Sequence, residues 1–179
     1  MIEQVVLVDD LGNAIGTANK AEVHTAETPL HLAFSCWLFN AEGELLMTRR
    51  ALSKLTWPGV WTNSFCGHPA PGEATEDAVY RRAQVELGIA PEDIAGMEIA
   101  VTDFRYRAVD SSGIVEHEIC PVYVAQLRPD VAVRSNPDEV DSLAWVVPAT
   151  LRAAAESTPF AFSPWLVEEL AQPGLRAYV

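Results

Sequence analysis

Residues 61–89 read WTNSFCGHPAPGEATEDAVYRRAQVELGI, and this stretch decides the fold. Its second half, from Glu73 to Leu87, is rich in Ala, Arg and Glu and contains no Gly or Pro, which predicts a helix. Gly88 follows at once and suits the left-handed position just past a helix end. The first half places a thiol, Cys66, two residues before an imidazole, His68. A thiol can exchange its proton near neutral pH and serve in catalysis, whereas the alternative is a small buried side chain that only fills space.

The segments on either side of this stretch predict an α+β fold. Apolar runs separated by turn residues predict strands. They are Ile2–Val8 and Ala14–Ala18, His31–Phe39 and Glu44–Thr48, Glu98–Asp110 and Ile114–Leu127, and Val140–Val147. We expect the first two pairs to be hairpins and the third pair to be two long strands joined at Ser111–Gly113. Pro148 and Pro164 suit the first turns of two further helices, with Ser163 as an N-cap. We therefore expect a mixed sheet covered by helices, in one compact domain spanning residues 1–179.

Composition and cysteine usage favour a soluble, cytoplasmic protein. The chain is 49% hydrophobic and 21% charged, and none of its apolar runs approaches the roughly 18 residues that a membrane span requires. The N-terminal residues show no basic region followed by an apolar stretch, so no secretory signal is expected. Three cysteines without a C-x-x-C pair indicate free thiols in a reducing compartment. Cys36 and Cys120 lie in apolar runs, where burial is expected, whereas Cys66 lies outside such a run.

The charge of the chain excludes one class of partner and leaves another open. With 12 basic and 25 acidic residues, the formal net charge is −13, which argues against binding to nucleic acid. No Asp or Glu occurs between Leu45 and Gly72, however, while Arg49, Arg50 and Lys54 fall close together in that segment. These cations would either create a local positive field for a small anion or lie on a solvated loop.

Glu116 and Glu118 flank His117 in a predicted strand. Side chains alternate along a strand, so both carboxylates face one side and His117 faces the other. Because the surrounding run is apolar, the two carboxylates would need a cation or a proton to compensate them if they were buried. The alternative is an exposed face of the strand.

Three of the four histidines add a candidate metal site. His24, His31 and His68 lie in different predicted elements, as ligands gathered by folding would. Three imidazoles with two carboxylates would suit a divalent transition metal, since imidazole binds zinc or iron and carboxylate binds manganese. No H-x-x-x-H or C-x-x-C spacing marks such a site, and a lone histidine is more often structural.

Two other groups have competing interpretations. Glu86 lies four residues after Arg82 on the predicted helix, which favours an ion pair on one helix face. Aromatic side chains would either pack in the core or line a pocket in which they stabilise a cation. The aromatic residues in question are Trp57, Trp61, Tyr106 and Trp165.

The helix and the turn before it resemble the Nudix box, G-x5-E-x7-R-E-U-x-E-E-x-G-U, where U is aliphatic. The matching residues are Gly67, Glu73, Arg81, Glu86, Gly88 and Ile89. Two glutamates of the box are missing, because Arg82 and Val85 stand in their places. In Nudix hydrolases these glutamates hold the divalent ions that drive attack of water on a diphosphate. The resemblance therefore implies a Nudix-like fold that gathers a diphosphate, with impaired hydrolysis and chemistry elsewhere on the substrate.

Five separated motifs resemble one Nudix branch, the type 1 isopentenyl-diphosphate isomerases, over about Lys20 to Trp165. They are residues 48–54 (TRRALSK), 57–64 (WPGVWTNS), 66–69 (CGHP), 104–108 (FRYRA) and 163–165 (SPW). The resemblance implies interconversion of isopentenyl and dimethylallyl diphosphate in isoprenoid precursor biosynthesis. The double bond would move by protonation and deprotonation through a carbocation-like state. It implies a small-molecule isoprenoid diphosphate as substrate, and we expect a monomer or weak homodimer that binds no nucleic acid.

The resemblance also implies roles for individual residues. One divalent metal (Mn²⁺, Zn²⁺ or Mg²⁺) would be held by His24, His31, His68, Glu116 and Glu118. Glu86 would hold the Mg²⁺ that accompanies the substrate diphosphate. The phosphate oxygens would be bound by Lys20, Arg50, Lys54 and Arg82. Proton transfer would fall to Cys66 and Glu118, with Tyr106 assisting and Trp165 near the reacting carbons.

Two other functions remain as alternatives. One is a Nudix pyrophosphohydrolase acting on a nucleoside diphosphate derivative, which Arg82 and Val85 disfavour. The other is a catalytically silent module that retains the fold and binds a metal or ligand. Turnover of isopentenyl diphosphate separates an isomerase from both.

Overall fold

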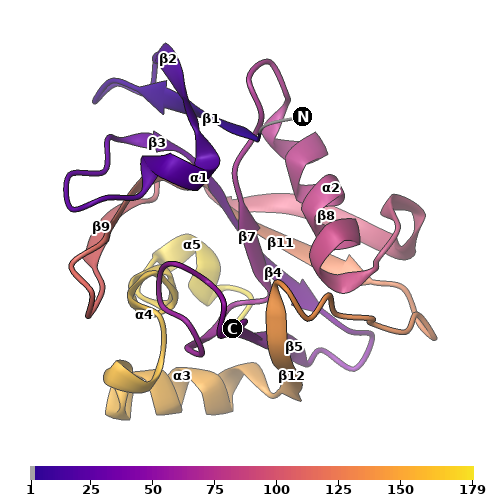
Figure 1. Cartoon of the computed structure of the whole chain (residues 1–179). Helices are drawn as coiled ribbons and strands as arrows, with labels where there is room; N and C mark the ends of the chain where they lie inside the picture. The colour runs from indigo at the N-terminus through magenta and orange to yellow at the C-terminus, as the bar shows by residue number, and fades with distance from the viewer. Residues whose placement is uncertain (1–2) are drawn as a thin grey trace.

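The computed structural model describes residues 3–179, which form two mixed sheets with helices over them (Figure 1). The first sheet has the order β2-β1-β3-β10-β9 and consists of β1 (Gln4–Val8), β2 (Ala14–Asn19), β3 (His31–Leu32), β9 (Arg105–Val109) and β10 (Val115–Ile119). The second has the order β12-β5-β4-β11-β8 and consists of β4 (Phe34–Phe39), β5 (Leu45–Arg50), β8 (Ile94–Val101), β11 (Val122–Leu127) and β12 (Val140–Val146). Two short strands complete it: β6 (Trp61–Thr62) pairs with β5, and β7 (Phe65–Gly67) pairs with β4.

The helices follow the predicted signals closely. They are α1 (Lys20–Val23), α2 (Thr75–Leu87), α3 (Pro148–Ser157), α4 (Pro164–Leu170) and α5 (Pro173–Arg176), with 3-10 turns at Pro91–Asp93 and Pro159–Ala161. Gly88 ends α2 with a φ of 65°, and the Ser163 hydroxyl caps α4 by accepting a hydrogen bond from Leu166 N at 3.3 Å. The α+β prediction is confirmed. Helix α2 begins two residues later than expected because Ala74 is extended and acts as its N-cap.

The predicted long strands are wrong in one respect, because each is divided between the two sheets. The run His31–Phe39 breaks at Ala33 into β3 and β4, and the run Ile114–Leu127 breaks at Cys120 and Pro121 into β10 and β11. The run that was expected to begin at Glu98 starts at Ile94 and divides into β8 and β9. Pro121 has no N–H to donate to a ladder, which gives the middle break a local cause.

The divided strands still run side by side across their breaks. Strand β3 pairs in parallel with β10, and β4 pairs in parallel with β11. Backbone hydrogen bonds from Ala33 N to Ile119 O (2.9 Å) and from Ser35 N to Pro121 O (3.1 Å) bridge the junction. The two strand pairs therefore pass from the first sheet to the second side by side. The carboxyl end of β10 lies at this junction.

The predicted hairpins are confirmed in part. Strands β1 and β2 pair antiparallel as expected, although Ile2 lies outside the described residues. Strands β4 and β5 turn at residues 40–43 but pair only at Phe39 and Leu45. Beyond that point β7 pairs with β4 and β6 pairs with β5. The segment that carries Cys66 thus lies between the arms of the second hairpin.

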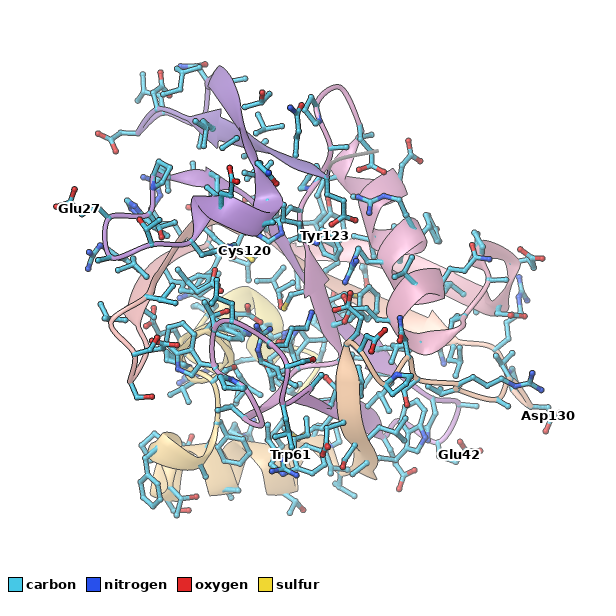
Figure 2. The ribbon with its side chains drawn as sticks, viewed as in Figure 1. Glu27, Glu42, Trp61, Cys120, Tyr123 and Asp130 are labelled. Atoms are coloured by element: carbon cyan, nitrogen blue, oxygen red, sulfur yellow. The ribbon has the colours of Figure 1, made fainter. Side chains whose placement is uncertain are left out.

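Two apolar cores lie on the two faces of the second sheet, and strand β4 contributes to both. Phe34, Cys36 and Leu38 pack with α2, while Trp37 packs with α4 on the other face. Figure 1 shows α2 on one side of the strands and α3, α4 and α5 on the other. Cys120, labelled in Figure 2, lies in the interior and is buried, as is Cys36, whereas the labelled acidic residues extend from the periphery. No helix in residues 3–179 is long and apolar enough to cross a membrane.

Gly67 allows helix α2 to approach strand β7 closely. A Cβ atom at this position would lie 2.7 Å from Arg82 Cγ and 3.0 Å from the Phe34 ring. Such distances are shorter than van der Waals contact, so any side chain here would push the helix away. The glycine therefore brings Arg82 and Glu86 of α2 beside Cys66, its chain neighbour on β7.

Candidate active site

The predicted site residues line one cavity of about 230 Å³, with the exception of His31, which is fully buried beside it. Those lining it are Lys20, His24, Arg50, Lys54, Cys66, His68, Arg82, Glu86, Tyr106, Glu116, Glu118 and Trp165. They come from both sheets, from α1, α2 and α4, and from the loop after β5. The cavity therefore lies where the two sheets and three helices meet.

Four of the predicted ligands form a tight group at one end of the cavity. Their ligand atoms all lie within 4.8 Å of one another; the residues are His24, His31, His68 and Glu118. Strand pairing explains part of this, because Glu118 of β10 is the register partner of His31 on β3. The side chain of Glu118 approaches both neighbouring rings, with Oε1 at 3.0 Å from His68 Nε2 and 3.5 Å from His31 Nε2.

The tautomer of His31 leaves a lone pair directed into this group. Its Nδ1 lies 2.9 Å from Pro29 O, and because a carbonyl can only accept, Nδ1 carries the proton. The unprotonated Nε2 then lies 3.3 Å from Nε2 of His68. A backbone carbonyl that fixes a histidine tautomer in this way is typical of metal ligands.

Glu116 lies just outside the group of four and faces the same side of β10 as Glu118. Both carboxylates are buried, while His117 points to the opposite side, where its Nδ1 lies 3.3 Å from Thr28 O. The exposed-face alternative for the two carboxylates is therefore excluded. Glu116 Oε2 lies 3.0 Å from His24 Nε2, and both atoms are buried without a hydrogen-bond partner among the described residues.

These donors fit a divalent metal ion. Buried polar atoms are normally paired, so the unpaired His24 Nε2 and Glu116 Oε2 require an explanation, and a cation between them supplies one. Burial alone would raise the pKa of Glu118, but its close contacts with His31 and His68 outweigh burial and hold that pKa well below its usual value. Glu118 is therefore ionised, the form in which a carboxylate binds a metal ion.

Cys66 lies on β7, and its thiol is held by one neighbouring side chain. Asn63 Nδ2 lies 3.3 Å from the sulfur, and the thiol donates to Asn63 Oδ1 at 3.4 Å. Burial raises the pKa of Cys66 well above its usual value. The sulfur atom therefore carries its proton and borders the same cavity as Glu118.

An aromatic wall separates the metal-binding group from the apolar core. Tyr106 donates a hydrogen bond to Glu118, and its ring centroid lies 5.7 Å from that of Trp165. Trp57 packs edge-on against Trp165 at 5.4 Å, and its backbone has a φ of 43°, an uncommon conformation for a bulky residue. Trp165 and Tyr106 are both buried and both line the cavity, so core packing and pocket lining coexist. Neither Trp57 nor Trp61 lines it.

The lining of the same cavity also contains several cations. Arg82 is almost completely buried and donates to Glu86 at 2.7 Å and to Glu139 at 3.1 Å. Lys54 also pairs with Glu139. Arg50 donates to Thr56 O at 2.8 Å, and its guanidinium carbon lies 5.4 Å from the Trp165 ring. Glu139 therefore joins Lys54 to Arg82, while Arg50 lines the same cavity without contacting that group of ion pairs.

Several residues that line the cavity or bond to its side chains were not predicted from the sequence. Glu139 and Thr56 line the cavity, the latter donating to Glu116 Oε1 at 2.6 Å, but neither belongs to a local pattern of charged or apolar residues. Asn63 lies inside the opening stretch, where only its bonding to Cys66 reveals a role. Glu169 is buried and contacts β4 from α4, a relationship that no local spacing indicates.

Comparison with known proteins identifies the family. A family model described as the NUDIX domain matches residues 29–166. The Isopentenyl-diphosphate Delta-isomerase of Paenarthrobacter aurescens (strain TC1) is 60% identical over 164 residues, which cover 92% of this chain and 86% of the relative. That of Corynebacterium diphtheriae is 57% identical over 175 residues, which cover 98% and 95%. The chain belongs to the isopentenyl-diphosphate Delta-isomerase family of NUDIX-domain proteins.

The fold agrees with this family membership. The crystal structure of DR0079 from Deinococcus radiodurans matches with a TM-score of 0.71 at 21% identity, covering 95% of this chain and all of that chain. In the present chain, two residues of the NUDIX box have a structural role, because Arg81 Nη2 pairs with Glu73 Oε2 at 2.7 Å. Arg82 stands where the box has a glutamate, and it pairs with Glu86, one of the two box glutamates that this chain retains.

Proposed function

We propose that the cavity interconverts isopentenyl diphosphate and dimethylallyl diphosphate, with Cys66 and Glu118 as the two proton carriers. The observation that carries this proposal is their common position in one cavity, whose lining also includes members of a buried His and Glu group and several cations. The family membership supports the same reaction, since relatives at 57% and 60% identity carry the isomerase name.

The reaction needs two proton carriers because it moves a double bond without changing the formula of the substrate. A proton added to the terminal methylene forms a new C–H bond and leaves positive charge on the adjacent tertiary carbon. Loss of a proton from C2 then returns an electron pair, which forms the new double bond. Cys66 and Glu118 would handle these protons, and the reversible reaction exchanges their roles as acid and base.

The aromatic wall suits the charge that develops in this reaction. An isolated alkene is a very poor base, so the cationic state needs stabilisation in a pocket from which water is excluded. The π face of Trp165 would stabilise that cation, an effect worth roughly 0.5 to 2 kcal/mol. The hydroxyl of Tyr106, bonded to Glu118, would fix the carboxylate toward the reacting carbon.

The metal-binding group and the cations would hold the rest of the substrate. His24, His31, His68, Glu116 and Glu118 would bind one divalent ion (Mn²⁺, Zn²⁺ or Mg²⁺). When bound, that ion supplies charge that alters the acidity of Glu118 and restricts its position.

The diphosphate of the substrate would lie beside the cations of the cavity lining. Lys20, Arg50, Lys54 and Arg82 would bind the phosphate oxygens, and Glu86 would bind the Mg²⁺ that accompanies the diphosphate. The three cysteines are free, which supports a reducing, cytoplasmic setting, and we propose a monomer or weak homodimer.

One assay tests this function against its rivals. The protein is incubated with isopentenyl diphosphate and Mg²⁺ plus Mn²⁺ or Zn²⁺, and dimethylallyl diphosphate and released phosphate are both measured. We expect dimethylallyl diphosphate without phosphate release. Phosphate release without the allylic isomer would favour a pyrophosphohydrolase, and no turnover with retained metal binding would favour a silent module.

A further inference from the structure

Helix α4 carries a second functional side chain on the same face as Trp165. Glu169 lies four residues further along the helix, so the two side chains are neighbours on its surface. The Glu169 side chain is fully buried, and no ion pair to it occurs within residues 3–179. Burying an uncompensated carboxylate is costly, so a carboxyl group at this place needs a reason.

Two donors from one face of strand β4 hold this carboxyl group. Glu169 Oε2 accepts from the Ser35 hydroxyl at 2.8 Å and from Trp37 Nε1 at 2.6 Å. The other oxygen, Oε1, is buried without a hydrogen-bond partner among the described residues. Burial raises the pKa of Glu169 to about 8, although the two donors lower it, so the group is mainly protonated near neutral pH.

The bond from Ser35 to Glu169 leaves the Ser35 oxygen as an acceptor for the Asn63 amide. The Ser35 hydroxyl has one proton and gives it to Glu169, so its oxygen can only accept from its other neighbours. It accepts from Asn63 Nδ2 at 2.9 Å, which assigns the amide nitrogen to that side. Cys36 O, Phe65 O and Cys66 Sγ also lie within hydrogen-bond distance of Nδ2, at 3.0, 3.1 and 3.3 Å, so its two N–H protons are shared among four acceptors, and the two carbonyls fix the same orientation of the amide.

The opposite end of the Asn63 amide then meets the reacting groups. Asn63 Oδ1 accepts from Trp165 Nε1 at 3.1 Å and from the Cys66 thiol at 3.4 Å. If the amide were reversed, its NH₂ would face the indole N–H, and the acceptor for Trp165 would be lost. A continuous chain of hydrogen bonds therefore runs from Glu169 through Ser35 and Asn63 to Cys66 and Trp165.

We propose that Glu169 and Ser35 are positioning residues that act through Asn63 to hold the Cys66 thiol and the Trp165 indole in register with the substrate. This inference deepens the proposed function and rests on it. Neither residue lines the cavity. Their loss should therefore lower kcat and leave KM nearly unchanged, because Arg50, Lys54 and Arg82 lie outside this chain of bonds.

The test compares three variants in the metal-loaded protein. Glu169→Met removes the acceptor at similar length, Ser35→Ala removes the connecting hydroxyl, and Glu169→Gln keeps a neutral acceptor for Ser35 and Trp37. We expect kcat to fall roughly 10- to 100-fold in the first two, as for a misplaced reacting group, with KM within about threefold of wild type. Glu169→Gln should retain at least about half of the wild-type kcat, since an amide reproduces the neutral acceptor.

Ser64→Ala provides the matched control. Its buried hydroxyl accepts from Leu38 N at 2.7 Å and donates to Leu46 O at 2.6 Å, with no bond to the Asn63 side chain. Its loss should lower Tm and leave kcat within about twofold, because a lost hydrogen bond costs stability alone. If Glu169→Met fails to fold, Ser35→Ala decides the test, since it deletes a single oxygen.

The outcomes separate this inference from the function on which it rests. Absence of turnover in the wild-type protein overturns the proposed function. If the wild-type protein turns over substrate, two results overturn the inference alone. One is a full kcat in Ser35→Ala, and the other is an equal loss of kcat in Glu169→Gln and Glu169→Met. A rise in KM without a fall in kcat also contradicts it.

Discussion

The Tyr106 hydroxyl donates a 2.9 Å hydrogen bond to Glu118 Oε2, and the two residues are register partners on adjacent antiparallel strands. The pairing of the two strands places the hydroxyl beside the carboxylate, so the carboxylate cannot rotate without breaking this bond. The other carboxylate oxygen faces His31 and His68. Glu118 thus connects the metal-binding group with the aromatic wall.

Tyr106→Phe should lower kcat roughly 10- to 100-fold with little change in KM. The substitution removes only the hydroxyl that orients Glu118, and general acid–base groups contribute about 10²- to 10⁴-fold when well placed. Steady-state kinetics with isopentenyl diphosphate measures the effect, and metal content should stay at the wild-type level. A variant with wild-type kcat would show that the metal-binding group alone orients the carboxylate.

Cys66→Ala and Glu118→Gln should separate proton transfer from metal binding. Cys66 is not among the clustered ligand atoms, so Cys66→Ala should abolish isomerisation and keep metal and fold. Glu118→Gln should lose both bound metal and turnover, because an amide is a weak ligand beside the three histidines. Elemental analysis and an isomerase assay on the same samples test the pair. Undiminished metal occupancy in Glu118→Gln would count against ligation.

Gly67→Ala should both destabilise the protein and raise KM. The added methyl group would lie 2.7 Å from Arg82 Cγ, so helix α2 must shift and carry Arg82 away from the diphosphate. Overpacking of this kind costs about 1–3 kcal/mol. Gly96→Ala is the matched control, since nothing lies within 4 Å of its added Cβ. Chemical denaturation and KM measure the two effects, and equal behaviour of the two variants would contradict the close approach.

The stability of the protein should depend on pH through Glu169. Its pKa is about 8 when folded against an ordinary 4.5, so between these values the unfolded chain releases a proton that the folded protein retains. The free energy of unfolding therefore falls by up to about 1.4 kcal/mol per pH unit from this group as pH rises through that window, and levels off outside it. Glu169 therefore contributes its full stabilisation of the folded state only at pH values below the pKa that it has in the unfolded chain.

Glu169→Gln removes this slope, so its stability relative to wild type should increase from pH 5 to pH 7.5. Urea denaturation of both proteins at the two pH values measures the difference. Other titratable groups near Glu169 stay the same in both proteins and cancel; they are Cys36, Cys66, Cys120, Glu118 and Glu168. Parallel pH dependence of the two proteins would disprove a proton held by Glu169.

Local patterns in the sequence predict much of the site. Alternation along one strand placed Glu116 and Glu118 on the same side, and burial of both shows that this side faces inward. Charge spacing identified Arg50 and Lys54 as a candidate anion site. Such inferences succeed because strand alternation and charge clustering depend only on neighbours in the chain.

Partners distant in sequence could not be predicted in this way. Asn63 meets Trp165 across 102 positions, and Ser35 meets Glu169 across 134. Glu139 joins Lys54 and Arg82 from a segment with no motif. Each of these contacts depends on how strands pair and how α4 docks, which no periodicity encodes.

The amino-acid order alone determined that helix α2 ends at Gly88, that prolines begin α3 and α4, and which side chains could serve as metal or phosphate ligands. Tertiary structure alone decided that three long apolar runs divide between two sheets, and that Glu169 supports Asn63. The physical reason is the range of the interactions. Helix ends and side-chain alternation are set by backbone geometry over a few residues. Sheet membership and buried hydrogen bonds depend instead on which distant strand or helix pairs with each polar group.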